Sequence, residues 1–155
     1  MRTVIYLSAI GMAALTLSAA HAEPFLSIGI SEDYGEHVVG PDGRPVYAFD
    51  SERRGGDGLS PLDSCLDPCR ERWPPVFSGT DIAVGEGLDP ELAGTIEDQA
   101  GRVAVYAGEP LFYFFEDQPG QEPVGQAIHS FGGWWYLMRP DGKFIDTGIT
   151  PETDG

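Results

Sequence analysis

The chain has 155 residues, with 9 basic and 25 acidic side chains and a net charge of −16. So acidic a surface repels nucleic acid and anionic lipid headgroups, which excludes roles that depend on binding either one. Glycine (21) and proline (13) are too frequent for long helices, and the apolar residues come in short bursts between turn signals. The composition therefore predicts an all-β fold made mainly of antiparallel hairpins.

The N-terminus, residues 1–22, predicts a secretory signal peptide. A single charge at Arg2 precedes an apolar run that ends near Leu17, and small residues follow up to Ala22. The run is shorter than the roughly 20 apolar residues of a spanning helix, so we expect cleavage between Ala22 and Glu23 rather than a membrane anchor. No cysteine lies near this point to carry a lipid. We expect a soluble periplasmic or secreted protein with no direct membrane insertion.

Removal of the signal leaves eight basic residues against 25 acidic ones, a net charge of −17. Residues 23–147 have the length of a single β-rich domain, and the polar residues 148–155 are expected to form a flexible tail. Charged partners of such a chain are expected to be cationic, with a cationic or cell-envelope protein as the candidate. Solubility alone would explain the acidity equally well.

Strands are expected at 36–40, 45–50, 102–106, 110–115, 133–139 and 143–146. Asp-Gly stands in the middle of the turns at 41–44 and 141–144, which predicts a hairpin at each. Segment 51–64 has no hydrophobic period and is expected to be a surface loop.

One short connecting helix is expected, at residues 89–94. Asp89 can cap its free N–H groups, Pro90 suits the first helical position, and Gly94 can end it.

The decapeptides at 43–52 (GRPVYAFDSE) and 108–117 (GEPLFYFFED) share glycine, proline and two aromatic positions in one register. A shift of 65 residues aligns them, and each is followed by tryptophan. This internal similarity predicts two pseudo-symmetric copies of one β-rich unit, at about 36–77 and 101–142.

The repeated positions resemble a bacterial family of secreted-repeat proteins, often lipoproteins, that carries a Tyr-x-(Phe/Trp/Tyr)-x-x-Asp motif. The matching residues are Tyr47, Phe49, Glu52 and Trp73 in the first copy, and Phe112, Phe114, Asp117 and Trp134 in the second. Glu52 replaces the motif's Asp and Phe112 replaces its Tyr, which argues against a catalytic role at either position. Function is largely unassigned in this family, so the resemblance implies a type of protein rather than an activity.

Alternation along a strand places Tyr47 with Phe49, and Phe112 with Phe114, on one face. We expect these rings to form a core between the copies. The rings of the opposite face, which are Tyr113, Phe115 and one of Trp134 or Trp135, would suggest a ligand patch if they are exposed.

The acids at the equivalent positions Glu52 and Asp117 have two interpretations. They could meet near a pseudo-twofold axis as a cation site or an acid–base pair. The favoured interpretation is that each accepts hydrogen bonds from backbone N–H groups in the turn that follows its strand.

The only cysteines, Cys65 and Cys69, are expected to form a structural disulfide in an oxidising compartment. A Cu(I) site with His37 or His129 is the alternative, and a redox-active dithiol is another. No Cys-x-x-Cys-His occurs for covalent haem, although His129 or Met138 could ligate a noncovalent haem. Metal candidates are thus Cys65, Cys69 and His129.

The chain has no G-x-S-x-G, H-E-x-x-H or P-loop motif, and we assign no catalytic residue. The sequence favours a non-enzymatic secreted or periplasmic protein that acts as a binding or cell-envelope module, with no resident cofactor assigned. The alternative is a periplasmic copper, haem or thiol redox accessory protein that uses the Cys-x3-Cys pair.

Overall fold

The computed structural model describes residues 23–51 and 60–146. The predicted signal peptide (1–22), Glu52 and the predicted tail (148–155) lie outside the described residues. The strands are β1 Ser27–Ser31, β2 Gly35–Val39, β3 Tyr47–Ser51, β4 Ala93–Asp98, β5 Gly101–Tyr106, β6 Glu109–Pro110, β7 Ile128–His129 and β8 Gly133–Leu137. The helices are α1 Pro61–Ser64, α2 Cys69–Arg72 and the 3-10 helix η1 Pro90–Leu92. The expected all-β fold is confirmed.

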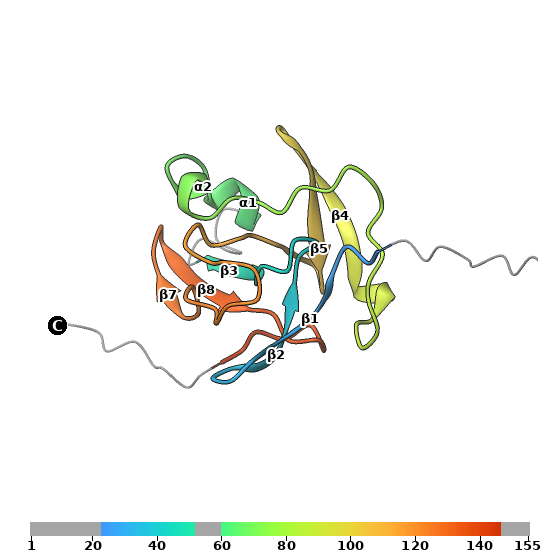
Figure 1. Ribbon diagram of the computed structural model, residues 1–155. Coiled ribbons are helices and arrows are strands. Elements are labelled where there is room, and N and C mark those ends of the chain that lie inside the picture. Colours follow the sequence, from blue (N-terminus) through green and yellow to red (C-terminus); the bar gives the residue numbers. More distant parts are fainter. Residues whose placement is uncertain (1–22, 52–59, 147–155) are drawn as a thin grey trace, which may run out of the picture.

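The strands form three small antiparallel sheets, β1-β2, β3-β8-β7 and β4-β5-β6. In Figure 1 the strands β7 and β8 lie on one side of β3, and β4 and β5 lie on the other. Tyr47 and Phe112 join the last two sheets, because each donates its N–H to the carbonyl oxygen of the other, at 2.8 and 2.9 Å. These two residues occupy equivalent positions of the repeat predicted from the sequence.

Both Asp-Gly turns reverse the chain as predicted, but each is closed by a single bridge, Val39 with Pro45 and Met138 with Phe144, rather than by a pair of regular strands. Gly43 and Gly142 each adopt a φ of +81°, which only glycine reaches without strain. The preceding Asp42 and Asp141 accept the N–H of the residue two positions on, each at 3.1 Å. The turn chemistry is therefore local, which is why the sequence alone identifies it.

Helical structure differs from the expectation. The connector at 89–94 contains only the 3-10 helix Pro90–Leu92, because Gly94 already belongs to β4 and does not end a helix. Asp89 caps it as expected, since its side chain accepts the N–H of Glu91 at 2.9 Å. Helices α1 and α2 were not expected, and α1 occupies part of the predicted surface loop at 51–64, of which 52–59 lie outside the described residues.

The strand expected at 110–115 is also wrong in part, because regular pairing stops at Pro110. Beyond it Tyr113 and Phe115 donate their N–H groups to the carbonyl oxygens of Pro74 and Arg72, both at 2.9 Å. Pro74 and Pro75 have no N–H to return, so a continuous ladder cannot form here. The arm expected as a strand at 143–146 makes one isolated bridge, between Phe144 and Met138, and strands β1, β4 and β7 were not expected.

Two apolar clusters form the core. The first contains the repeated aromatic positions together with the cysteines: Tyr47, Phe49, Leu62, Cys65, Cys69, Trp73, Val103, Phe112, Phe114, Trp135, Leu137 and Ile145. The second collects the alternate positions of the same segments, such as Val46, Ala48, Leu111 and Tyr113. The predicted shared core of Tyr47, Phe49, Phe112 and Phe114 is confirmed, since each of the four is at most 5% exposed.

Among the described helices, none has the length and apolar character needed to cross a membrane.

Candidate functional site

Tyr47 and Asp117 form a buried polar pair. The Tyr47 hydroxyl donates to Asp117 Oδ2 at 2.6 Å, and the N–H of Val124 donates to Asp117 Oδ1 at 2.9 Å. The N–H of Gly125 donates to the Tyr47 hydroxyl at 3.1 Å. A Cβ on Gly125 would lie 2.8 Å from the Tyr47 ring, so only glycine allows this approach. The pair is therefore fully hydrogen-bonded inside the fold.

Burial raises the pKa of the Asp117 carboxyl, while the hydrogen bonds from Tyr47 and Val124 oppose the rise. Burial, followed by the Asp117 charge, raises the pKa of the Tyr47 hydroxyl. Asp117 is 3% exposed, so no solute reaches it. The expectation that this acid accepts a backbone N–H holds for Val124, whereas no sequence pattern indicated the Tyr47 bond. The arrangement fits a structural role, and Glu52 lies outside the described residues.

An aromatic stack fills the first core cluster. Trp135 lies between Phe49 and Trp73, with ring centroids 4.1 and 4.0 Å away and interplanar angles of 9° and 3°. Phe114 continues the stack at 4.4 Å from Trp73, and Tyr47 meets Trp73 edge-on at 5.4 Å. Such contacts add to the free energy of area burial. The structure thus places Trp73 and Trp135 in the core, whereas the predicted motif residue Trp134 is half-buried on the other face of β8.

The sulfur atoms of Cys65 and Cys69 lie at disulfide-bonding distance, with Cα atoms 5.2 Å apart. The residues are 0% and 2% exposed and pack in the first core cluster. The disulfide joins the end of α1 to the start of α2. Burial of both sulfurs is the environment of an inert cystine rather than of a reactive thiol.

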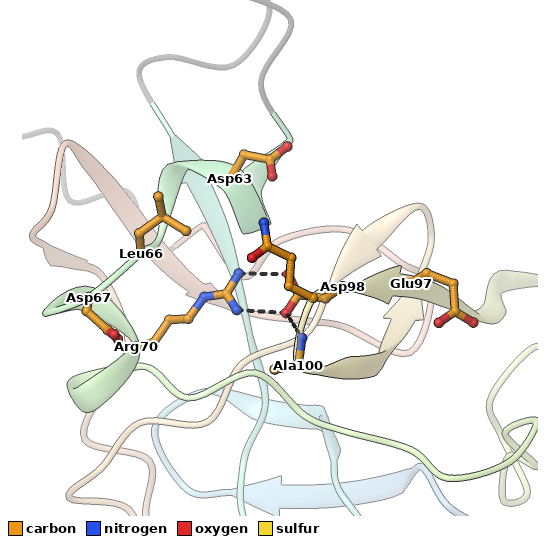
Figure 2. Close-up of a pocket in the computed structure, with 8 residues that line it drawn as sticks. Asp63, Leu66, Asp67, Arg70, Glu97, Asp98 and Ala100 are labelled. Atoms are coloured by element: carbon orange, nitrogen blue, oxygen red, sulfur yellow. Dashed lines mark hydrogen bonds and ion pairs between the residues drawn. The ribbon is translucent and has the colours of Figure 1, made fainter.

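Arg70 in α2 ties this segment to the β4–β5 hairpin. Its guanidinium makes two parallel bonds to Asp98, at 2.8 and 2.9 Å, which Figure 2 shows side by side. It also donates to the carbonyl oxygens of Cys65, at 2.7 Å, and Leu62, at 3.1 Å. The side chains are 18% and 8% exposed. The hydrogen bond from Arg70 holds the pKa of Asp98 below its ordinary value.

A cavity of about 500 Å³ opens beside this pair, with Asp63, Asp67 and Glu97 at its rim (Figure 2). These carboxylates do not converge on one point: within 23–51 and 60–146, no three His, Cys, Asp or Glu side chains gather as metal ligands. The candidate set of Cys65, Cys69 and His129 is therefore not assembled. The other haem candidate, Met138, is fully buried in the second core cluster.

The outer side of the β3-β8-β7 sheet carries a row of rings that we call the aromatic face, formed by His129, Trp134, Tyr136 and Phe144. Trp134 and Tyr136 alternate along β8 and stack with centroids 6.4 Å apart. His129, opposite Trp134 on β7, lies 4.8 Å from its ring, and Phe144 lies 5.6 Å from Tyr136. His129 is exposed and the other three residues are half-buried, with Phe144 also packed against the second core cluster, so each residue keeps part of its surface accessible.

Carboxylates flank the aromatic face. Asp50 on β3 is the cross-strand partner of Trp134, and Asp146 follows Ile145, whose N–H bonds to Leu137. Burial first, and then the charges of Asp50 and Asp146, raise the pKa of the Tyr136 hydroxyl. The face thus combines π-surfaces with negative charge, a combination that attracts organic cations.

The rings predicted to point away from the shared core differ in their exposure. Tyr113 packs into the second core cluster and Arg44 lies over its ring at 3.9 Å, whereas Phe115 is 44% exposed. The sequence did not identify Tyr136 and Phe144 as members of one surface. Alternation along β8 could have grouped Trp134 with Tyr136, but the contribution of Phe144 depends on the turn at 141–144 that folds it back.

No protein-family model, curated protein or solved structure matches this chain. The resemblance to the secreted-repeat family therefore stays a prediction.

Proposed function

We propose that this protein is a non-enzymatic, secreted or periplasmic binding module, and that its aromatic face takes a cationic segment of a partner such as a cell-envelope protein. The observation that carries the proposal is the accessible row of Trp134, Tyr136, Phe144 and His129 on one sheet surface. Rings that serve only the core would be covered, as Trp73 and Trp135 are. Accessible rings in a row suit ligand contact.

The charge of the face favours a cation. Arg and Lys side chains bind over aromatic rings, and Asp50 and Asp146 add Coulombic attraction at the same place. The net charge of −17 expected after signal cleavage extends this attraction beyond the face and speeds encounter with a basic partner. An anionic glycan or headgroup would meet repulsion instead.

The compartment and the repeat belong to the same proposal. The signal-like residues 1–22 and the disulfide favour an oxidising compartment outside the cytoplasm. The antiparallel pairing of Tyr47 with Phe112 supports two copies related by a pseudo-twofold axis. Burial of Cys65 and Cys69 favours a structural cystine over a copper or thiol redox role.

The test is calorimetric titration with a ten-residue peptide of alternating arginine and glycine, using the citrulline version as an uncharged control. We expect the arginine peptide to bind, and Trp134→Ala to weaken it at least tenfold, about 1.4 kcal/mol. Phe77→Ala removes a ring that is 45% exposed away from the face and should change affinity less than twofold.

Equal affinities in the two variants would contradict the proposal, because binding would then not depend on the aromatic face. Absence of binding by the arginine peptide would contradict the cationic partner.

A further inference from the structure

The structure has a second concavity, which shares no residue with the aromatic face. It is a cavity of about 250 Å³ lined by Arg72, Trp73, Phe114, Ile128, Ser130 and Phe131. Trp73 and Phe114, 1% and 5% exposed, belong to the core and close its inner side. Drug-sized ligands occupy cavities of about 300 Å³ or more, so this one suits a single ring or a short alkyl chain.

Arg72 gives this cavity a positive rim. The other Arg and Lys side chains of the described residues pair with carboxylates: Arg44, Arg70, Arg102, Arg139 and Lys143. Among these described cations, Arg72 alone has no carboxylate partner; its guanidinium lies 4.7 Å above the ring of the exposed Phe115. In a chain with so many acidic residues, an unpaired guanidinium beside an apolar cavity is available to an anion from outside.

Ser130 supplies a second polar group without a partner. Its Oγ is buried and makes no hydrogen bond, although its backbone is held by the N–H···O bond from Ser130 to Gly133 at 3.0 Å. A buried hydroxyl without a partner costs free energy and calls for an explanation. The next residue, Phe131, has a φ of +56°, which is unfavourable for a bulky side chain, and it lines the same cavity.

We propose that this cavity binds a small hydrophobic carboxylate, such as an aryl-alkanoate. Its ring or chain contacts Trp73, Phe114 and Phe131, and its carboxylate accepts hydrogen bonds from Arg72 and Ser130. The charge-assisted bond to the guanidinium distinguishes the acid from a neutral analogue of the same shape. The inference is independent of the proposed function, because the two surfaces have no residue in common.

The experiment is an NMR titration of ¹⁵N-labelled protein with 3-phenylpropanoate, compared with the neutral 3-phenylpropan-1-ol. We expect saturable shifts at the amides of Ile128, Ser130 and Phe131, and affinity for the acid at least tenfold above that for the alcohol. Arg72→Gln should remove that preference and leave alcohol binding unchanged. Arg139→Gln, which removes an exposed arginine elsewhere, should leave both affinities within twofold.

Ser130→Ala separates binding from folding. Because the hydroxyl has no partner in the free protein, the variant should unfold at the same temperature or higher, yet bind the acid at least threefold more weakly. The proposal is overturned if the acid causes no saturable shift at millimolar concentration, or if acid and alcohol bind equally. A lowered unfolding temperature for Ser130→Ala would remove Ser130 from the site.

Discussion

Tyr47 donates a 2.6 Å hydrogen bond to Asp117, which lies 70 residues further along the chain. In the alignment of the two predicted copies, this bond joins the Tyr of the first motif to the Asp of the second. The equivalent bond in the other direction would need a Tyr at Phe112 and an Asp at Glu52, and the sequence departs from the motif at both positions.

Tyr47→Phe should lower the free energy of unfolding by about 1–3 kcal/mol, because Asp117 Oδ2 and the N–H of Gly125 both lose a buried partner. The donor also lowers the pKa of Asp117, so the variant should raise that pKa further. Urea unfolding and NMR titration of the carboxyl measure the two effects. Tyr136→Phe is the control, and we expect it to stay within about 0.5 kcal/mol of wild type.

The neighbours Phe114 and Phe115 provide a matched pair of tests for the core. Phe114 is 5% exposed against Trp73, so Phe114→Ala should cost about 3–5 kcal/mol. Phe115 is 44% exposed, so Phe115→Ala should cost less than about 1 kcal/mol. Chemical denaturation of the two variants measures these two losses in the free energy of unfolding. Equal costs would mean that the face assignment at 112–115 is wrong.

The Arg70–Asp98 pair should make stability depend on pH in the acid range. Arg70 lowers the pKa of Asp98, so the pair stabilises the fold above the unfolded-state pKa of about 3.9, and this contribution is lost as pH falls through the lower folded-state pKa. Arg70→Gln should therefore cost about 2 kcal/mol at pH 7 and progressively less below about pH 4.

Thermal unfolding across pH measures this difference. Arg139→Gln, which breaks an exposed pair with an N–O distance of 3.8 Å, should change stability by less than about 0.5 kcal/mol at any pH. A cost for Arg70→Gln that stays constant down to pH 2 would contradict the assignment to Asp98 ionisation.

The Cys65–Cys69 disulfide should stabilise the fold modestly. The loop that it closes is short, so the chain-entropy estimate for the double variant Cys65→Ser, Cys69→Ser is about 2 kcal/mol. Intact mass before and after reduction should differ by the two hydrogens of one cystine. Alkylation of the folded, unreduced protein at either cysteine would contradict a closed, buried disulfide.

Sequence reasoning succeeded where the signal is local or strictly periodic. Gly43 and Gly142 sit in Asp-Gly turns whose chemistry is complete within four residues. Alternation placed Tyr47 with Phe49 and Phe112 with Phe114, and all four are buried together. These features do not depend on what the rest of the chain does.

The sequence did not predict structure that depends on pairing between segments far apart in the chain. The strand expected at 110–115 does not form in full, because Pro74 and Pro75 in the neighbouring segment have no N–H groups to complete a hydrogen-bond ladder. Helix α1 is only four residues long, too short to show a hydrophobic period. Its signal in the sequence is Ser60, which caps the helix by accepting the N–H of Asp63. The sequence did not predict that the rings of the aromatic face share one surface, because Phe144 reaches Tyr136 only through the turn at 141–144.

We propose the aromatic face as the functional surface, rather than the buried Tyr47–Asp117 pair or the disulfide. The decisive measurement is chemical-shift mapping of ¹⁵N-labelled protein with the arginine–glycine peptide. We expect the largest amide shifts at 129, 133–137 and 143–146, and we expect Trp134→Ala to need at least tenfold more peptide for the same shifts while Tyr47→Phe needs no more than wild type. Shifts spread evenly over the acidic surface, or unchanged in Trp134→Ala, would contradict the proposal.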